Sequence, residues 1–374
     1  MNDFKRLNEL TKEQKNKLNA IYKNFITDFD EMTTLSKQIR EILKENCFFS
    51  SLTLDHKIDS DNWQTTKMLW KTETWEFIES VIMRHLTWRN TLCISSQAWC
   101  PMACSFCATW KLWFLKNLTN YEIMEQIFYA AKMMNDEGSR LRNIVYMWMW
   151  EPFLNYDVVK ETITMASAQK KFDIWSRRIT VSTCWIVPWI DKFTKDFPQT
   201  SLAISLDAPN DEIRKKIMPV DHTWPLEKLM ASLDNYTDTT NKRIFYEYIM
   251  INWVNDHIKL AHELGKLLDE KKEIIWLKTR NGKSVKEILK EYLSSFEEKK
   301  IYCYSEKQVV NFIPYNPWEW TASDGFSPTP RFIIEKFQSI LKHYWIPSTI
   351  RATMWDDIDA ACWQLANKKI NKEK

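Results

Sequence analysis

The sequence predicts an α/β fold, a partial barrel of six β/α units with parallel strands, preceded by a small accessory domain of helices and strands. Two observations predict this class. From about residue 90 onward, short apolar β-rich runs alternate with helical patterns, and such alternation favours parallel strands joined by right-handed crossovers. The composition is globular, with 45% hydrophobic and 27% charged residues in 374 positions, which is enough chain for one large domain or two to three smaller ones.

Residues 1–85 form the expected accessory domain. Helical patterns come first, and Ile39, Ile42 and Leu43 share one face of the second pattern. Strand-like apolar runs follow them. The predicted elements lie at about 11–27, 36–46, 67–70 and 77–82.

The core is expected over 86–357, and the last segment over 358–374. Seven runs in the core have the length and composition of buried strands. They lie at 91–95, 143–147, 179–182, 202–205, 245–251, 309–313 and 349–353. The clearest helix start is at Thr119, because Glu122 three residues later completes a capping box. In such a fold the binding site lies at the carboxyl ends of the strands.

A charged stretch at 270–308 interrupts this alternation and is predicted to be an insertion, helical around 285–298. No run approaches 18 apolar residues, and the first residues lack the apolar core of a signal peptide. We therefore expect a cytoplasmic protein without membrane contact. The net charge of +3 is compatible with an RNA partner but does not require one.

The sharpest chemical signal is a C-x3-C-x2-C run, formed by Cys100, Cys104 and Cys107 directly after the first core strand. Three thiolates on one short loop can bind three irons of a [4Fe–4S] cube and leave the fourth iron open. Two alternatives are a structural zinc site, which prefers a second cysteine pair that is absent here, and a chance group of buried cysteines. Three further cysteines have no motif partner and are interpreted as structural, namely Cys47, Cys184 and Cys303.

Four motifs in order resemble the RlmN/Cfr-type radical S-adenosylmethionine (SAM) methyltransferases, which methylate adenine in RNA. They are Cys93-Ile-Ser-Ser-Gln-Ala-Trp-Cys100, Tyr146-Met-Trp-Met-Trp-Glu151-Pro152, Arg177-Arg-Ile-Thr-Val-Ser182-Thr and Asp356-Asp-Ile-Asp-Ala-Ala-Cys362-Trp-Gln-Leu. The resemblance covers nearly the whole chain, and the 270–308 stretch is the main extra piece. It implies a radical SAM barrel and an N-terminal domain that binds RNA.

The resemblance also assigns catalytic roles. It implies that Cys362 takes a methyl group from a first SAM, and that a 5′-deoxyadenosyl radical from a second SAM removes hydrogen from that methyl. The thiomethylene radical then adds to adenine. Cys93 matches the resolving cysteine, which releases the product by forming a disulfide with Cys362. Glu79 matches the carboxylate that accepts the ring proton, although a solvated strand glutamate is the alternative for so short a motif.

The SAM contacts implied by the resemblance all follow predicted strands. They are Trp150, Glu151, Ser182, Ser205, Leu206, Asp207 and Asn316. Asp207 stands where the family usually has His. The implied substrates are an adenosine at the peptidyl-transferase centre of large-subunit rRNA and the adenosine 3′ of the anticodon in some tRNAs, with C2 as the methylated carbon. An electron donor such as flavodoxin or ferredoxin and a monomeric enzyme are also implied.

The glycine content is anomalous. The chain has 20 Trp and only 4 Gly, whereas average usage would give roughly 26 glycines. Trp stands where the family pattern has Gly, at 99, 110, 113, 148, 150, 185, 355 and 363, and by looser matches at 75, 189, 253, 320 and 345. Our hypothesis is that UGA codons, read as glycine in the cell, were translated here as tryptophan.

Three alternatives remain open on the sequence alone. The first is C8 methylation by a variant of the same family. The second is a non-catalytic RNA-binding relative, which follows if the tryptophans are real and block the SAM site. The third is a radical SAM enzyme for a small molecule, which would leave Cys93 and Cys362 without a role.

Overall fold

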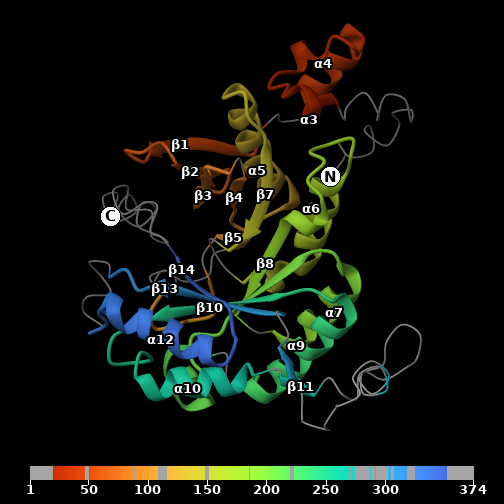
Figure 1. The fold of residues 1–374 in the computed structure, drawn as a ribbon. Coiled ribbons are helices and arrows are strands. Elements are labelled where there is room, and N and C mark those ends of the chain that lie inside the picture. The colour runs from red at the N-terminus through yellow and green to blue at the C-terminus, as the bar shows by residue number, and fades with distance from the viewer. Residues whose placement is uncertain are drawn as a thin grey trace.

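We analysed a computed structural model, shown as a ribbon in Figure 1. The structure describes most of the chain, and every statement below refers to that part. The described ranges are 20–46, 50–87, 89–98, 100–107, 116–147, 151–184, 186–219, 223–269, 271–273, 302–304, 307–317 and 325–351, with the single positions 287 and 291.

One ten-stranded sheet forms the centre of the fold, in the order β1-β2-β3-β4-β7-β8-β9-β10-β13-β14. The strands β1 to β4 pair antiparallel, and those from β4 to β14 pair parallel. Their bounds are β1 Leu52–Asp59, β2 Thr65–Thr72, β3 Phe77–Met83, β4 Asn90–Cys93, β7 Leu141–Tyr146, β8 Ile179–Thr183, β9 Ser201–Ser205, β10 Ile244–Met250, β13 Gln308–Pro314 and β14 Ser348–Ile350. All seven predicted core strands are therefore confirmed, and the sheet leaves β1 and β14 as its edges.

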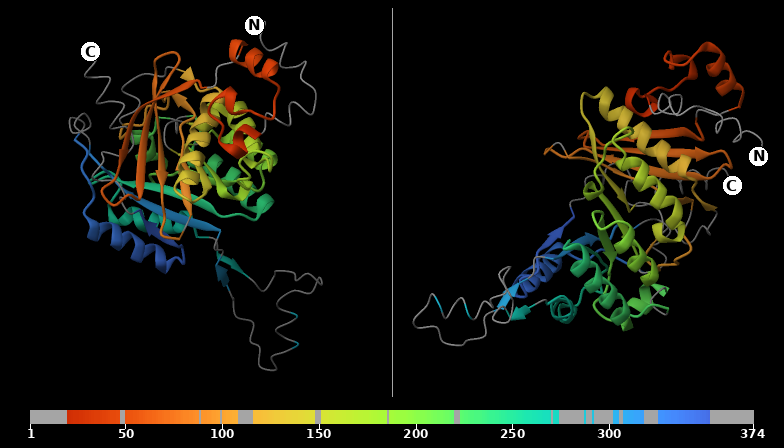
Figure 2. Two further views of the ribbon diagram at one scale, coloured as in Figure 1. Left: turned by 90° about the horizontal axis from the view of Figure 1, so that it is seen from above. Right: turned by 90° about the vertical axis from the view of Figure 1, so that its right-hand side faces the viewer.

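A helix follows each parallel strand except β14, so the six predicted β/α units are present. The helices cover the outer face of the curved sheet (Figures 1 and 2). They are α5 Asn120–Asp136, α6 Tyr156–Ser167, α7 Val187–Asp196, α8 Asp211–Ile217, α9 Leu226–Thr240, α10 Ile258–Leu267 and α12 Arg331–His343. The capping box at the start of α5 is confirmed, because Thr119 and Glu122 exchange both side-chain hydrogen bonds.

The N-terminal region divides into two parts. The helices α3 (Ala20–Asn24) and α4 (Lys37–Asn46) lie at the end of the molecule far from α10 and α12 (Figure 2). They enclose a small hydrophobic cluster of their own, made of Ile26, Met32, Leu35 and Leu43. The strands β1 to β3 instead continue the central sheet, because β3 pairs with β4.

Most of the predicted insertion at 270–308 lies outside the described residues. Its two ends form an antiparallel pair, β11 (Lys271–Glu273) with β12 (Tyr302–Tyr304). The rest of the sheet passes directly from β10 to β13, so the core is continuous without this stretch. No helix in the described part of the chain is long and apolar enough to cross a membrane.

Several tryptophans adopt a backbone conformation that L-residues avoid. Trp63, Trp75, Trp253 and Trp345 have φ angles of 58°, 72°, 61° and 58°, in the left-handed region that glycine favours. Their side chains are 62–91% exposed, so burial in the core does not compensate for the strain.

Each of these residues lies where a glycine is usual. Trp63 and Trp75 lie in the turns after β1 and β2. At the end of α12, Trp345 N–H donates to the Lys342 carbonyl and Ile346 N–H to the Leu341 carbonyl, the bonding pattern of a helix end that glycine normally closes. The conformations at 75, 253 and 345 therefore support the glycine hypothesis, and they extend it to 63. Trp189 lies in the regular helix α7 and gives no such support.

Candidate active site

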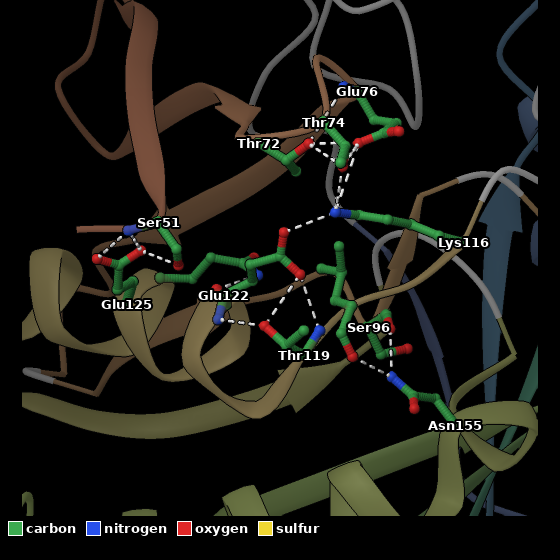
Figure 3. Close-up of polar contacts among 12 residues, drawn as sticks. Ser51, Thr72, Thr74, Glu76, Ser96, Lys116, Thr119, Glu122, Glu125 and Asn155 are labelled. Atoms are coloured by element: carbon green, nitrogen blue, oxygen red, sulfur yellow. Dashed lines mark hydrogen bonds and ion pairs between the residues drawn. The ribbon is translucent and has the colours of Figure 1, made fainter. Parts of the chain in front are cut away.

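The loop that carries the three cysteines is closed tightly at its base. The chain enters this loop through β5 (Gln97–Ala98) and returns from it through β6 (Lys116–Asn117). These two strands pair with each other. Asn155 is buried and donates from Nδ2 to the carbonyl oxygens of Ser96 and Leu118, at 2.8 Å each. Figure 3 shows this side chain pointing at both ends of the loop. One residue thus ties the cysteine loop to the segment that follows β7.

A lysine at the same base holds a second set of contacts. Lys116 Nζ lies 2.8 Å from Glu122 Oε1, 2.7 Å from Thr74 Oγ1 and 3.5 Å from Glu76 Oε2 (Figure 3). The returning end of the loop is thereby attached both to the capping box of α5 and to the turn between β2 and β3.

The cysteines themselves lie on a tight turn. Cys107 N–H donates to the Cys104 carbonyl at 3.0 Å, and Ser105 N–H donates to the carbonyl of Ile217 at the end of α8 at 2.9 Å. The backbone at Ala103 is left-handed, with φ of 55°. Burial raises the pKa of the Cys100 thiol, and the neighbouring Cys107 raises it further. Grouped thiols of this kind become thiolates readily only when a cation binds them.

This donor set fits an iron–sulfur cube better than a single metal ion. Among the described residues, no three His, Cys, Asp or Glu side chains converge on one ion. A cube needs no such convergence, because each of its irons takes a different cysteine. Cys100, Cys104 and Cys107 are all partly exposed on the one loop, so they are the residues that would hold it.

Glu151 lies next to this loop and is 1% exposed. Its carboxylate accepts from the Thr183 hydroxyl at 2.7 Å, from Cys184 N–H at 2.6 Å and from Phe153 N–H at 3.1 Å. Burial raises the pKa of Glu151, and these donors partly oppose that effect. These three donors are uncharged, so none of them neutralises the carboxylate. Glu151 can therefore bind a positively charged ligand group, such as an ammonium.

The sequence did not indicate that Cys184, interpreted there as structural, contacts the predicted site. The Cys184 thiol lies 3.0 Å from Glu151 Oε2. Its pKa is raised first by a hydrogen bond with Cys104 and then by burial. Cys184 therefore links the carboxylate to the cysteine loop. Its position one residue after the serine–threonine motif at the end of β8 was the available signal.

The other predicted SAM contacts lie at or after the carboxyl ends of parallel strands. Ser182 is the next-to-last residue of β8, Ser205 is the last residue of β9, and Asn316 follows β13 and is exposed. Leu206 and Asp207 follow β9 and are buried, and Leu206 N–H donates to the Glu247 carbonyl of β10 at 2.8 Å. These are carboxyl ends of parallel strands, where ligands bind in such folds.

Asp207, which replaces the family's histidine, has an unusual environment. Its backbone is left-handed, with φ of 56°, and its Oδ1 accepts from Ile249 N–H at 2.8 Å. Burial raises the pKa of Asp207 to about 7, although that N–H and the Arg214 guanidinium lower it. At this position the chain therefore has a carboxyl that is partly protonated near neutral pH.

Two of the three predicted catalytic residues share one face of the sheet. Val81 is paired with Cys93 across β3 and β4, and Glu79 lies two residues before Val81. Side chains of paired residues, and of residues two apart, project to the same face. Glu79 and Cys93 are 0% and 1% exposed. The opposite face carries Trp70, whose ring packs 5.1 Å from that of Tyr129 on α5.

Glu79 also has a partner that the sequence did not indicate. Lys67 Nζ lies 3.0 Å from Glu79 Oε2, and both side chains are fully buried. Cys362 and Trp150, the remaining predicted site residues, lie outside the described residues.

The chain is similar to known radical SAM proteins. A family model described as the radical SAM superfamily matches residues 94–264. A Protochlamydia amoebophila protein named a probable dual-specificity RNA methyltransferase RlmN is 34% identical over 349 residues, or 93% of this chain and 87% of that protein. A Staphylococcus saprophyticus protein, also named a probable dual-specificity RNA methyltransferase RlmN, is 34% identical over 94% of this chain and 86% of its own length.

A solved structure covers the same extent. A radical SAM methyltransferase from Sphaerobacter thermophilus matches with a TM-score of 0.81 and 31% identity, over 96% of this chain and 94% of that one. The likeness therefore includes the antiparallel strands and the parallel barrel together. The chain belongs to the RlmN family of radical SAM methyltransferases.

Proposed function

We propose that this enzyme methylates C2 of an adenosine in large-subunit rRNA, at the peptidyl-transferase centre, and the adenosine 3′ of the anticodon in some tRNAs. The relatives are named dual-specificity RNA methyltransferases, and a net charge of +3 is compatible with an RNA substrate. The main support for the proposal is that Glu79 and Cys93 project from the same face of the sheet. Cys93 ends β4, the strand that precedes the cysteine loop.

The chemistry of the substrate explains why these residue types are needed. C2 of adenine is an electron-poor carbon and no nucleophile, so it cannot attack the methyl group of SAM directly. When bound, a [4Fe–4S] cluster on Cys100, Cys104 and Cys107 supplies the electron that turns SAM into a source of a carbon radical. Glu151 would bind the SAM ammonium, because every hydrogen-bond donor to its buried carboxylate among the described residues is uncharged.

The protein's own residues then carry the methyl group and release the product. Cys362 holds the methyl as S-methylcysteine, and two SAM molecules are used per turnover. Glu79 accepts the proton that the ring carbon loses, which restores aromaticity. Cys93 attacks the sulfur of Cys362, so that a disulfide forms as the bond between this sulfur and the methylene carbon breaks. The released carbon takes up a proton to become the methyl group, and the remaining unpaired electron would return to the cluster that supplied it. A cellular reductant then restores both thiols. Cys93 lies at the end of β4 and is buried, which protects a reactive thiol from other oxidants.

Several further properties belong to the same proposal. The enzyme is a cytoplasmic monomer, its electron donor is a flavodoxin or ferredoxin, and its RNA-binding domain comprises residues 1–85. The core extends over 86–357, and the segment that carries Cys362 over 358–374.

Mass spectrometry of RNA digests tests the proposed function. RNA lacking the modification is incubated anaerobically with reconstituted enzyme that has glycine at the family-glycine positions, SAM and a reductant. We expect 2-methyladenosine, and none when Cys362→Ala replaces the natural residue. Formation of 8-methyladenosine alone would overturn the C2 assignment, and a protein that binds RNA but no cluster would indicate the non-catalytic relative.

A further inference from the structure

We infer that Lys67 is a positioning residue that supplies the counter-charge to the buried Glu79 carboxylate, so that Glu79 can act as a proton acceptor. The inference rests on the proposed function, because it takes Glu79 as the acceptor. Its basis is the ion pair between Lys67 Nζ and Glu79 Oε2, 3.0 Å apart with both side chains fully buried.

The sheet holds the two side chains together. Lys67 is paired with Val81 across β2 and β3, and Leu69 with Glu79. Lys67 and Glu79 are therefore diagonal neighbours on the same face, within reach of a long side chain. The backbone of Glu79 is fixed as well, because Ser95 Oγ donates to its carbonyl at 2.6 Å. The carboxylate thus has a fixed place on the face that also carries Cys93.

The positive charge of Lys67 offsets the cost of burying the Glu79 carboxylate. A carboxyl group in an apolar interior without a counter-ion takes up a proton, and a protonated carboxyl cannot accept another. Lys67 supplies that counter-ion from the neighbouring strand. In the proposed step the C2–H bond of the adduct breaks, its electron pair stays with the ring, and the proton moves to a Glu79 oxygen. The ammonium that remains then favours release of this proton before the next turnover.

Other titratable groups share this face, and the test must separate them from Lys67. They are His56 on β1, Lys71 on β2 and Cys93 on β4, by the register of these strands. His56 hydrogen-bonds Asp55 at 2.6 Å and its side chain is 54% exposed. Lys71 places its ammonium 3.4 Å from the centre of the Trp75 ring. The ion pair with Glu79 is formed by Lys67.

Removal of the charge tests the inference. In Lys67→Met, we expect the yield of methylated adenosine per SAM cleaved to fall on the order of 10–100-fold at neutral pH, less than the 10²–10⁴-fold typical of losing the base itself, because Glu79 is still present. The yield should recover as the pH rises, because a higher pH ionises the unpaired Glu79. Lys67→Gln, which keeps a donor without the charge, should behave like Lys67→Met, while Lys67→Arg should restore most of the yield.

An isotope effect separates proton transfer from packing. With RNA deuterated at C2 of the target adenosine, we expect a larger primary isotope effect on product formation in Lys67→Gln than in the unsubstituted enzyme, because proton removal becomes slower. Lys160→Met is the matched control, since that lysine forms an ion pair of 2.8 Å with Asp196 on the outer helices. Its pH profile and isotope effect should match those of the unsubstituted enzyme.

The outcomes are distinguishable. A pH profile and isotope effect for Lys67→Gln equal to those of the unsubstituted enzyme would overturn the inference, and so would an additional loss when Lys67→Gln is combined with Glu79→Gln. If Glu79→Gln alone keeps full product formation, the proposed role of Glu79 is wrong instead. Cluster absorbance and a thermal melt of each variant identify losses that come from misfolding.

Discussion

The antiparallel and the parallel parts of the sheet each bury a carboxylate beside β4, but they balance its charge in different ways. Glu79 of β3 has the ammonium of Lys67 at 3.0 Å. Glu151, which follows β7, has the neutral hydroxyl of Thr183 and two backbone N–H groups. Burial raises the pKa of Glu151. The first carboxylate is thus compensated within the protein, and the second is left for a cationic ligand.

This difference suggests a division of labour between the two parts. In the proposed function the parallel part binds the cofactors, so its side chains should govern cluster binding and SAM cleavage. The antiparallel part should then govern what happens to the RNA base afterwards. Variants on either side of β4 should therefore fail at different steps.

The largest effect that separates the two parts is expected for Cys104→Ala and Glu79→Gln. Cys104→Ala removes a proposed cluster ligand, so we expect no cluster absorbance, no SAM cleavage and no product. Glu79→Gln should keep the cluster and SAM cleavage but lower methylated product on the order of 10²–10⁴-fold. Assays of 5′-deoxyadenosine and methyladenosine in the same samples measure both steps. Loss of SAM cleavage in Glu79→Gln would erase the proposed division.

Glu151 should make SAM binding depend on pH. Because its pKa is raised by burial, protonation competes with the SAM ammonium, and the affinity for SAM should fall with decreasing pH at higher pH values than an ordinary glutamate would give. Glu151→Gln should weaken binding by about 1.5–3 kcal/mol, the range of hydrogen bonds to charged groups, and remove this pH dependence. Anaerobic calorimetry of the holoenzyme measures both. An unchanged pH dependence in the variant would assign the effect to another group.

Asn155 connects the cysteine loop to the segment after β7, and its loss should act on the parallel part alone. In Asn155→Ala, the carbonyls of Ser96 and Leu118 lose the amide group that donates to both of them. We expect this loss to lower the free energy of unfolding by about 2–4 kcal/mol. The iron content per chain should fall with it.

Asn90→Ala is the matched control for this prediction. Asn90 is buried at the start of β4 and donates to Ser139 Oγ at 2.6 Å and to the Arg140 carbonyl at 3.2 Å. Its loss should lower stability by a similar amount without lowering the iron content. If both variants lose iron equally, Asn155 has only a general structural role.

Asp207 adds a pH-dependent term to stability in the parallel part. Its pKa rises from an ordinary 3.8 to about 7 on folding, so the folded state binds the proton more tightly than the unfolded state. Stability should therefore fall as the pH rises between these values. Asp207→Asn cannot ionise and should be more stable above neutral pH, on the order of 1–3 kcal/mol. Urea unfolding across this range checks it, and a difference that does not grow with pH would contradict it.

The sequence predicted the parallel half of the fold well because its signals are local. The seven core strands and the capping box of α5 follow from apolar runs and from the spacing of Thr119 and Glu122. The common face of Glu79 and Cys93 could not be read in the same way, because it depends on the register of β3 against β4. Lys67 was missed for the same reason. Its partner lies on another strand, and a lysine in a β-rich run is usually solvated.

The smallest effect concerns the left-handed tryptophans, which occur in both parts of the sheet. Trp63 and Trp75 lie in antiparallel hairpins, and Trp253 and Trp345 in the parallel part. In a chain synthesised with Trp at all four positions, Gly at each should raise the free energy of unfolding by about 1 kcal/mol, because a left-handed L-residue costs roughly 1–2 kcal/mol.

At Trp70 the same substitution, Trp to Gly, should lower the free energy of unfolding instead of raising it. It is buried, and its Nε1 donates to Ser80 Oγ at 2.8 Å, so Trp70→Gly should destabilise by about 3–5 kcal/mol, as large core truncations do.

Peptide mass spectrometry of the protein from its own cells should find Gly at 63, 75, 253 and 345. UGG codons or tryptophan masses at these positions would reject the reassigned codon. In that case the left-handed tryptophans of the antiparallel and the parallel part would be residues of the natural enzyme.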